Sequence, residues 1–332
     1  MRPAPLRSFA VPTATLAAVV LTAVVLTAVV LAALVLLAAC APAADEPFPT
    51  AMPDVDALAS EIDSLLAITP DATVAMTVID GATTFHHGDP NRAFHAASTM
   101  KVPVLIELVR QAEAGRFALD DSLVLANDFR SILDGSAYQI SADADTALYV
   151  RLGEPVPLRT LAERMVTHSS NLATNLLIAQ VGADSVQATI EQLGTTTMRV
   201  LRGVEDIPAY RAGLSNTATA HDLARLMSAL MNGRAVGPEA DASMIEILLD
   251  QRHNEMIPAG LPTGARVAHK TGWITCIHHD AAIVYPEPSA TLQTPYVLVI
   301  LTEGIDDYDA SAALGASIAG AVHAAFRPTT PS

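Results

Sequence analysis

Strand-like segments lie near both ends of the chain that follows residue 53, and a long helical stretch separates them. Residues 72–79 alternate in polarity and are rich in β-branched side chains, and residues 83–86 can return from the turn at Asp80-Gly81. Three more strand-like segments follow much later, at residues 266–271, 281–285 and 296–301. Because strands need a common core, the order predicts one sheet assembled from both ends of the chain, with helices inserted between.

Apolar residues at helical spacing predict helices at residues 54–68, 98–113 and 309–326, and in the middle at 158–165, 171–181, 185–193, 219–231 and 241–249. Residues 119–157, called the excursion below, lack periodicity and are expected to form a surface segment with one or two short helices. Residues 201–215 are expected to be a loop. The predicted domain spans 54–326, with sheet from 54–115 and 265–326 and a helical insert at about 116–264.

The first 40 residues have the composition of an export signal. Arg2 and Arg7 precede an uncharged apolar run from Phe9 to Ala39, and Cys40 follows Leu37-Ala38-Ala39. We expect a lipoprotein-type signal peptide at 1–40, lipidation of Cys40 and a tether at 41–53. An uncleaved signal anchor is the alternative, since the run can span a bilayer. Either interpretation predicts an exported, extracytoplasmic or periplasmic protein tethered to a membrane.

The charge balance excludes several classes of partner. The chain has 19 Lys and Arg against 35 Asp and Glu; without the two leader arginines the balance is 17 against 35, or −18. Nucleic acids and anionic lipid surfaces favour basic proteins, so neither is an expected partner. Cys276 is the only cysteine besides Cys40, so no internal disulfide or thiolate zinc site is expected. No phosphate loop is present, and we expect a monomer without cofactor or metal.

Three short motifs carry the chemistry. They are Ser98-Thr99-Met100-Lys101 at a predicted helix start, Ser169-Ser170-Asn171 at another, and Lys270-Thr271-Gly272 at a strand. Each alone is most simply a helix cap or a turn. A serine becomes nucleophilic when a base removes its proton, and Lys101 lies one helical turn from Ser98. Burial and nearby positive charge lower a lysine pKa enough for that role. All three motifs together indicate a serine nucleophile.

The order of these motifs resembles class A β-lactamases and related penicillin-recognising serine hydrolases, whose signatures are S-x-x-K, S-D-N and K-T-G. The resemblance covers about 54–326. It implies an α/β fold of the α+β type: a five-stranded antiparallel sheet with flanking helices plus an all-helical subdomain. It also implies roles for residues: Ser98 as nucleophile, Lys101 and Ser169 as proton relay, Asn171, Lys270, Thr271 and Gly272 in substrate binding, and the amides of Ser98 and Trp273 as oxyanion hole.

The sequence departs from the family pattern at three places. Ser170 replaces the aspartate of S-D-N, and the interval from Ser98 to Ser169 is about ten residues longer than usual. Glu205 follows at the interval of the deacylating glutamate, but Ala209 stands where the water-holding asparagine would be. Glu205 is the candidate base, or a loop acid paired with Arg202 or Arg211. Asp206 fits the register less well. The run Arg202-Gly203-Val204-Glu205-Asp206 resembles the branch called class A β-lactamase-related serine hydrolases.

Three functions remain open from the sequence. The first is a β-lactamase, in which water hydrolyses a Ser98 acyl-enzyme. The second is a cell-wall D-Ala-D-Ala peptidase, amidase or esterase-like penicillin-binding protein that deacylates slowly, acting on peptidoglycan-like substrates. The third is a non-catalytic lipoprotein on the same fold. Among other residues, Trp273 is expected beside Lys270. His278-His279-Asp280 could form a metal site or triad, but we expect His279 and Asp280 to fix a turn.

Overall fold

The computed structural model describes residues 53–286, apart from residue 142, and residues 294–327. The predicted signal peptide, Cys40 and all but the last residue of the predicted tether lie outside these residues. Within the described part, no helix combines the length and the apolar character needed to cross a membrane.

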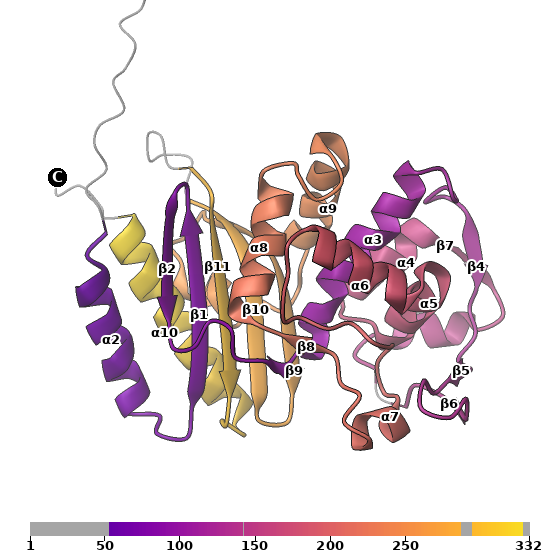
Figure 1. Cartoon of the computed structure of the whole chain (residues 1–332), viewed down its shortest axis with the longest axis horizontal. Coiled ribbons are helices and arrows are strands. Elements are labelled where there is room, and N and C mark those ends of the chain that lie inside the picture. Colours follow the sequence, from indigo (N-terminus) through magenta and orange to yellow (C-terminus); the bar gives the residue numbers. More distant parts are fainter. Residues whose placement is uncertain (1–52, 142, 287–293, 328–332) are drawn as a thin grey trace, which may run out of the picture. The chain divides into compact units, whose positions relative to one another are not determined.

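The sheet is built from both ends of the chain, as predicted. β1 (Thr73–Asp80) and β2 (Thr83–His87) form a hairpin, and the late strands are β9 (Arg266–Ile274), β10 (Ile277–Tyr285) and β11 (Tyr296–Glu303). Their antiparallel order is β2-β1-β11-β10-β9 (Figure 1). The central strand β11 is buried from Tyr296 to Thr302, as expected for a strand covered on both faces. Its predominantly apolar sequence therefore follows from its position.

Helices cover both faces of the sheet. α2 (Val55–Ala67) and α10 (Tyr308–Phe326) pack together on one face, and the short helix η3 (Ile257–Gly260) packs against α10 (Figure 1). Asp54 and Asp307 cap the two long helices by accepting backbone N–H groups. On the other face, α8 (Ala220–Met231) lies against β1, β10 and β11. This helix belongs to the segment that we expected to be an insert, yet it packs on the sheet.

The remaining helices surround α3 (Lys101–Glu113), whose side chains are buried from Lys101 to Val109. α4 (Leu158–Thr167), α5 (Asn171–Val181), α6 (Ala183–Gln192) and α9 (Pro238–Leu249) contact α3. A helix buried on all sides must pair its polar groups internally. Glu107 is the example, since its carboxylate accepts hydrogen bonds from Gln111 and Thr189. α3 thus begins with Lys101 of the Ser98 motif and buries this lysine at the centre of the helical region.

The irregular segments are more ordered than expected. The described residues of the excursion include the short helix that was expected, η2 (Thr146–Arg151), but they also form four short strands: β4 (Ser122–Val124) pairs with β7 (Pro155–Pro157), and β5 (Phe129–Arg130) pairs with β6 (Ala137–Tyr138). The predicted loop at 201–215 contains α7 (Ile207–Arg211), with Pro208 in its first turn. β3 (Phe94–His95) pairs with β8 (Thr217–Ala218). Elements this short carry too few residues for a periodic pattern.

Candidate active site

Ser98 lies in η1 (Ala97–Met100), a 3-10 turn that leads directly into α3. The turn is held by its own side chains: His95 Nδ1 accepts from the Ala97 amide at 3.1 Å, and Thr99 Oγ1 donates to the Ala96 carbonyl at 2.6 Å. Ala97 has φ 45°, a left-handed conformation that costs about 1–2 kcal/mol in a residue with a side chain. Such strain is typical of functional turns, and here it directly precedes the serine.

Lys101 is fully buried one turn after Ser98. Its Nζ donates to the Ser169 carbonyl at 2.6 Å, to Ser169 Oγ at 3.1 Å and to Asn171 Oδ1 at 3.0 Å. Burial lowers the pKa of Lys101 well below its usual value, and the nearby Lys270 lowers it further, while Asp143 and Glu205 oppose this. The first two motifs of the sequence therefore meet at an amine suited to accept a proton.

Lys270 reaches the same hydroxyl group from the sheet. Its Nζ donates to Ser169 Oγ at 3.2 Å and to the Thr271 carbonyl at 2.8 Å, and the side chain is fully buried. Burial lowers the pKa of Lys270 to about 7, although Asp280 raises it. Ser169, which has φ 55°, thus places one hydroxyl between two buried lysines. A proton can move through such a hydroxyl, because it both donates and accepts.

Strand β9 lies directly against the Ser98 turn. A Cβ atom added to Gly272 would sit 2.9 Å from the Ser98 amide nitrogen and 3.1 Å from Ala97 Cβ. Only a residue without a side chain allows this approach. Thr271 is buried, whereas Trp273 is 52% exposed, with its ring edge-on to Tyr308 at 5.6 Å between centroids. The third motif therefore joins the other two, and the Trp273 side chain lies at the start of α10.

Glu205 is connected to this group through Asn171, whose Nδ2 donates to Glu205 Oε1 at 3.1 Å. Its other oxygen accepts from the backbone amide of Ser141 at 2.8 Å and from Ser141 Oγ at 3.2 Å. Asn171 thus bridges Lys101 and Glu205. Glu205 has φ 59°. In the described part of the chain, four non-glycine residues have positive φ, and three of them, Ala97, Ser169 and Glu205, belong to this group. The carboxylate of Glu205 is thus linked to Lys101 Nζ through the two ends of the Asn171 amide.

The loop around Glu205 is held by contacts that the sequence did not predict. Asn175 on α5 binds both backbone groups of Val204, accepting from its amide at 2.6 Å and donating to its carbonyl at 3.0 Å. The Arg202 guanidinium donates to the Leu214 and Gly203 carbonyls. Asp206 is buried and accepts from Ser131 Oγ at 2.7 Å and from the Ile132 amide at 2.9 Å. The Asp206 carboxylate therefore stabilises the packing of this loop against the excursion. No local sequence pattern predicts the contacts of Asn175, Arg202 or Asp206.

The His278-His279-Asp280 run is not a turn but lies near the start of strand β10, so that expectation was wrong. The three side chains have separate partners: His278 Nδ1 lies 2.8 Å from Ser311 Oγ, His279 Nε2 lies 3.0 Å from the His95 carbonyl, and Asp280 lies 2.9 Å from His269 Nδ1. Burial lowers the pKa of His279 to about 4. Within the described ranges, no group of three His, Cys, Asp or Glu side chains is arranged to hold a metal.

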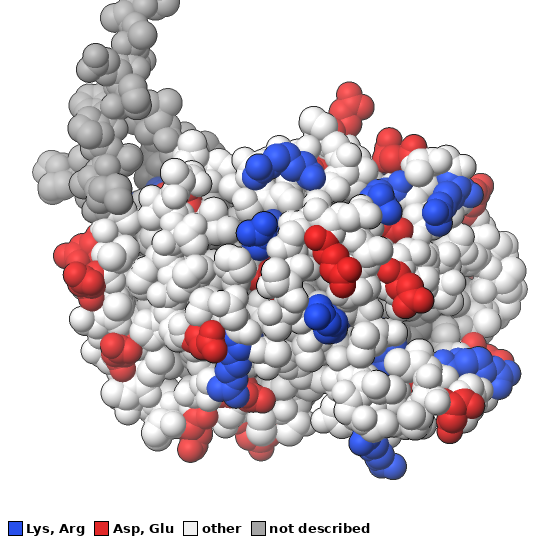
Figure 2. Space-filling view, viewed as in Figure 1, with Lys and Arg blue, Asp and Glu red and all other residues white. Residues whose placement is uncertain are grey.

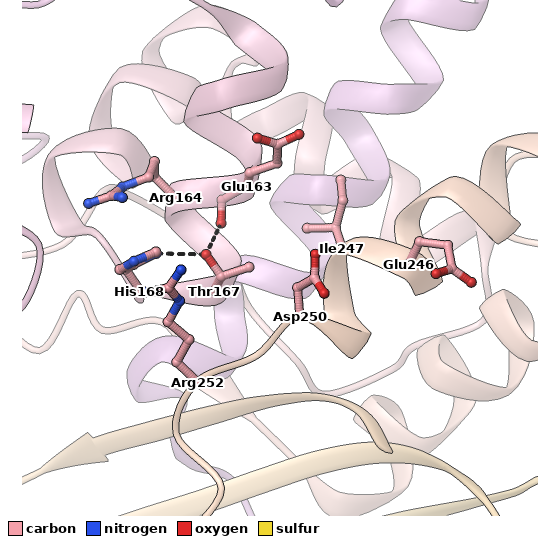
Figure 3. A pocket seen from close by; sticks show the side chains of 8 residues that line it. All are labelled: Glu163, Arg164, Thr167, His168, Glu246, Ile247, Asp250 and Arg252. Atoms are coloured by element: carbon pink, nitrogen blue, oxygen red, sulfur yellow. Dashed lines mark hydrogen bonds between the residues drawn. The ribbon is translucent and has the colours of Figure 1, made fainter. Parts of the chain in front are cut away.

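A separate polar hollow lies beside His168, the residue before Ser169. Figure 3 shows that it is bordered by the ends of α4 and α9 and by Arg252. Its lining mixes both charges: Arg164, His168 and Arg252 with Glu163, Glu246 and Asp250. Basic and acidic side chains are also interspersed on the face of the molecule drawn in Figure 2, which shows no continuous basic area. Of the residues that line this hollow, Arg164 also bonds toward the site, since its carbonyl accepts from the Ser170 amide.

Comparisons with known proteins agree with this geometry. The model of the "Beta-lactamase enzyme family" matches residues 57–326. A beta-lactamase from Bacillus amyloliquefaciens is 26% identical over 218 residues, which are 64% of this chain and 66% of that protein. The ROB-1 beta-lactamase from Haemophilus influenzae is 25% identical over 178 residues, 47% of this chain and 57% of that protein. The match thus spans less than two thirds of these relatives' length.

Solved structures show the same fold. A beta-lactamase from Sphaerobacter thermophilus superposes with a TM-score of 0.71 at 28% identity, covering 84% of this chain and all of that one. A structure of PBP-A gives 0.70 at 26% identity, with 82% and 97% covered. The predicted fold class and the resemblance drawn from the three motifs are therefore confirmed. Since the family model covers most of the chain, this protein belongs to the beta-lactamase enzyme family.

Proposed function

We propose that the protein opens β-lactam rings by forming an acyl-enzyme on Ser98 that water then hydrolyses. The observation that carries the proposal is the chain of groups Lys101–Ser169–Lys270, in which one hydroxyl bridges two buried amines next to the Ser98 turn. A surface lysine is protonated at neutral pH, whereas these two have lowered pKa values. The arrangement therefore supplies a base for the serine and a route for its proton.

In the acylation step, Ser98 Oγ attacks the lactam carbonyl carbon while its proton passes to Lys101 Nζ. The C–N bond of the ring then breaks, and the ring nitrogen takes a proton from Ser169 Oγ, which regains one from Lys101. The amides of Ser98 and Trp273 stabilise the oxyanion, and removal of one such donor costs about 3–4 kcal/mol in known enzymes. Asn171, Lys270, Thr271 and Gly272 orient the substrate, with the Lys270 charge facing its carboxylate.

In the deacylation step, Glu205 takes a proton from water and the hydroxide attacks the ester carbonyl carbon. The bond from that carbon to Ser98 Oγ then breaks as the same proton passes from Glu205 by way of Lys101 to Ser98 Oγ, so that Glu205 and Lys101 return to their starting forms. The hydrogen bonds of Glu205 to Asn171 and Ser141 support this role, because they fix the carboxylate and link one of its oxygens to the amide group that contacts Lys101. Ala209, at the position expected for a water-holding asparagine, is buried and donates its amide to Asp206. Asn171 and Ser141 are then the polar side chains that orient the water.

Intact-mass measurements over time test this proposal. The protein is mixed with benzylpenicillin and with a cephalosporin, and both the adduct and the released product are followed. We expect a transient adduct with continuous turnover. The Glu205→Gln variant should acylate normally but keep its adduct, with deacylation slower by about 10²–10⁴-fold. Ser98→Ala is the matched control and should remain unlabelled. Equal turnover by Glu205→Gln and the parent would refute the role of Glu205.

A second candidate is a penicillin-binding enzyme that deacylates slowly and acts on peptidoglycan-like amides. Ala209 favours it, since the amide side chain expected there is missing. One of the similar solved structures is described as a PBP-A mutant in an acyl-enzyme complex with penicillin-G. For this candidate the parent itself would retain the adduct, so the same time course separates the two functions.

Export and tethering belong to the same proposal. A β-lactam or cell-wall substrate is met outside the cytoplasm, and the leader with Cys40 would deliver and anchor the domain there. The mass of the membrane-bound protein tests this: a chain that begins at Cys40 and carries added lipid mass would support lipidation. A chain that keeps residues 1–39 would indicate the signal anchor instead.

A further inference from the structure

Two departures from the family pattern meet at one carboxylate. The second motif lacks its usual acid because residue 170 is serine, and the excursion is longer than usual. The excursion brings Asp143 to the start of α5, where Asp143 Oδ2 accepts from the Leu172 amide at 2.9 Å and from Ser170 Oγ at 3.3 Å. An acid at residue 170 would stand at this same helix N-terminus. Asp143 therefore brings a carboxylate to the place where the sequence has lost one.

Ser170 and Asp143 divide the capping of α5 between them. Ser170 is fully buried and its Oγ accepts from the Ala173 amide at 3.3 Å, as an N-cap residue does. The Leu172 amide is bonded to Asp143 instead. A negative charge at a helix N-terminus is favourable, because the unpaired N–H groups there carry partial positive charge. The N-cap residue Ser170 is thus uncharged, and the negative charge at the start of α5 comes from Asp143 in the excursion.

Asp143 is itself held by a network within the excursion. Its carboxylate accepts from Tyr149 Oη at 3.1 Å and from the Asp145 amide at 3.0 Å. Asp145 is buried and paired with Arg164 of α4, whose Nε lies 2.6 Å from Asp145 Oδ2. The Arg164 backbone carbonyl in turn accepts from the Ser170 amide at 3.1 Å. This closed set of contacts fixes Asp143 relative to Ser169-Ser170-Asn171.

The charge of Asp143 reaches Lys101 through that segment. Lys101 donates to Ser169 and Asn171, the residues on either side of Ser170. The charged groups that act on Lys101 are Lys270 from β9, Glu205 from the loop before α7 and Asp143 from the excursion. Lys270 and burial favour the neutral amine, and the two acids favour the protonated one. Asp143 is the member of this set that the three sequence motifs and the family pattern do not include.

We propose that Asp143 is a positioning residue that supplies, from the excursion, the carboxylate that the second signature would carry at residue 170. Through the 169–171 segment it orients Lys101 and balances its charge, without contact to substrate. This inference rests on the proposed acylation of Ser98. It also gives the extra length of the excursion a function, since this segment carries Asp143 to the start of α5.

The test is the pH dependence of Ser98 acylation by benzylpenicillin, measured by quenched intact mass in the full protein. Neutral Lys101 is the active form, so the rate falls at low pH where Lys101 gains a proton. Asp143→Asn removes a charge that favours protonation, so the acid limb should move to lower pH. The plateau should fall by at most about tenfold, since the base itself remains. Asp128→Asn, an exposed change in the same excursion, should leave the profile unchanged.

Two further variants separate charge from simple support. Tyr149→Phe removes one hydrogen bond but no charge, so it should lower the plateau and leave the acid limb in place. In the double variant Asp143→Asn/Ser170→Asp, the acid limb of the pH–rate profile should move back toward its position in the parent protein. The inference is overturned if Asp143→Asn has the melting temperature of the parent and an unmoved limb. A parent that is never labelled at any pH overturns the proposed function, and this inference with it.

Discussion

The two sides of the candidate site are built in different ways. On the sheet side, residues 270–273 are positioned by the ladder of β9 and β10, in which Lys270 pairs with Ala281 and Gly272 with His279. On the excursion side, Ser131, Ser141 and Asp143 reach residues 170–172 and 205–206 through one or two hydrogen bonds each. A ladder spreads each position over many contacts, whereas the excursion side depends on individual polar side chains. The two sides should therefore respond differently to mutation.

The largest expected effect on the sheet side is on stability. The folded state lowers the pKa of Lys270 to about 7, so between pH 7 and the ordinary lysine value the unfolded chain binds more protons. The free energy of unfolding then rises with pH over this window, and the cost of the buried charge is greatest below pH 7. Lys270→Met removes this cost. We expect the variant to be more stable than the parent by several kcal/mol at pH 7, with acylation lost.

Denaturant unfolding of both proteins from pH 7 to 9.5 measures this difference, which should shrink as the pH rises. Arg266→Met at the exposed start of the same strand is the control, because its side chain lies at the surface near Glu246. A difference between Lys270→Met and the parent that is independent of pH would show that Lys270 has an ordinary pKa in the folded protein.

The sheet side was predictable from the sequence because its residues repeat a pattern. The strand expected at 296–301 is β11, which begins at the same residue and ends two residues later, and the last helix was predicted within one residue. β10 was the exception, since His278, His279 and Asp280 are polar and looked like a turn. Each of them finds a buried partner from another element, namely Ser311, His95 and His269. Such long-range pairing overrides local polarity, and periodicity cannot report it.

A smaller effect, on rate, is expected from Gly272→Ala. The new methyl group would lie 2.9 Å from the Ser98 amide nitrogen, a backbone atom that must move for it to fit. A displacement of about 1 Å at a reacting group can cost on the order of 100-fold in rate. We therefore expect acylation to slow by about that factor, measured as the rate of adduct formation with benzylpenicillin. Gly237→Ala is the control, because a Cβ there meets open space. Unchanged acylation would mean that the turn adapts.

The excursion side could be predicted only in part. The interval from Asn171 identified Glu205, but not the groups that hold it. Ser141 and Asp143 lie in a segment without period, and Asn175 is one of several polar residues on a helix buried on most sides. Their contacts join residues about 30 to 75 positions apart, as in the pairing of Ser131 with Asp206. A single sequence contains the residue types for these contacts, but the pairing depends on the packed fold.

The smallest expected effect tests whether the excursion side depends on single bonds. Asp206 is buried and accepts from Ser131 Oγ, the Ile132 amide and the Ala209 amide. Asp206→Asn keeps the shape but loses the charge and one acceptor, so we expect a loss of about 1–2 kcal/mol in unfolding free energy. Since Glu205 is the neighbouring residue, deacylation should slow more than acylation. Asp128→Asn should change neither the unfolding free energy nor the deacylation rate. Equal slowing of acylation and deacylation in Asp206→Asn would show that Asp206 does not position Glu205.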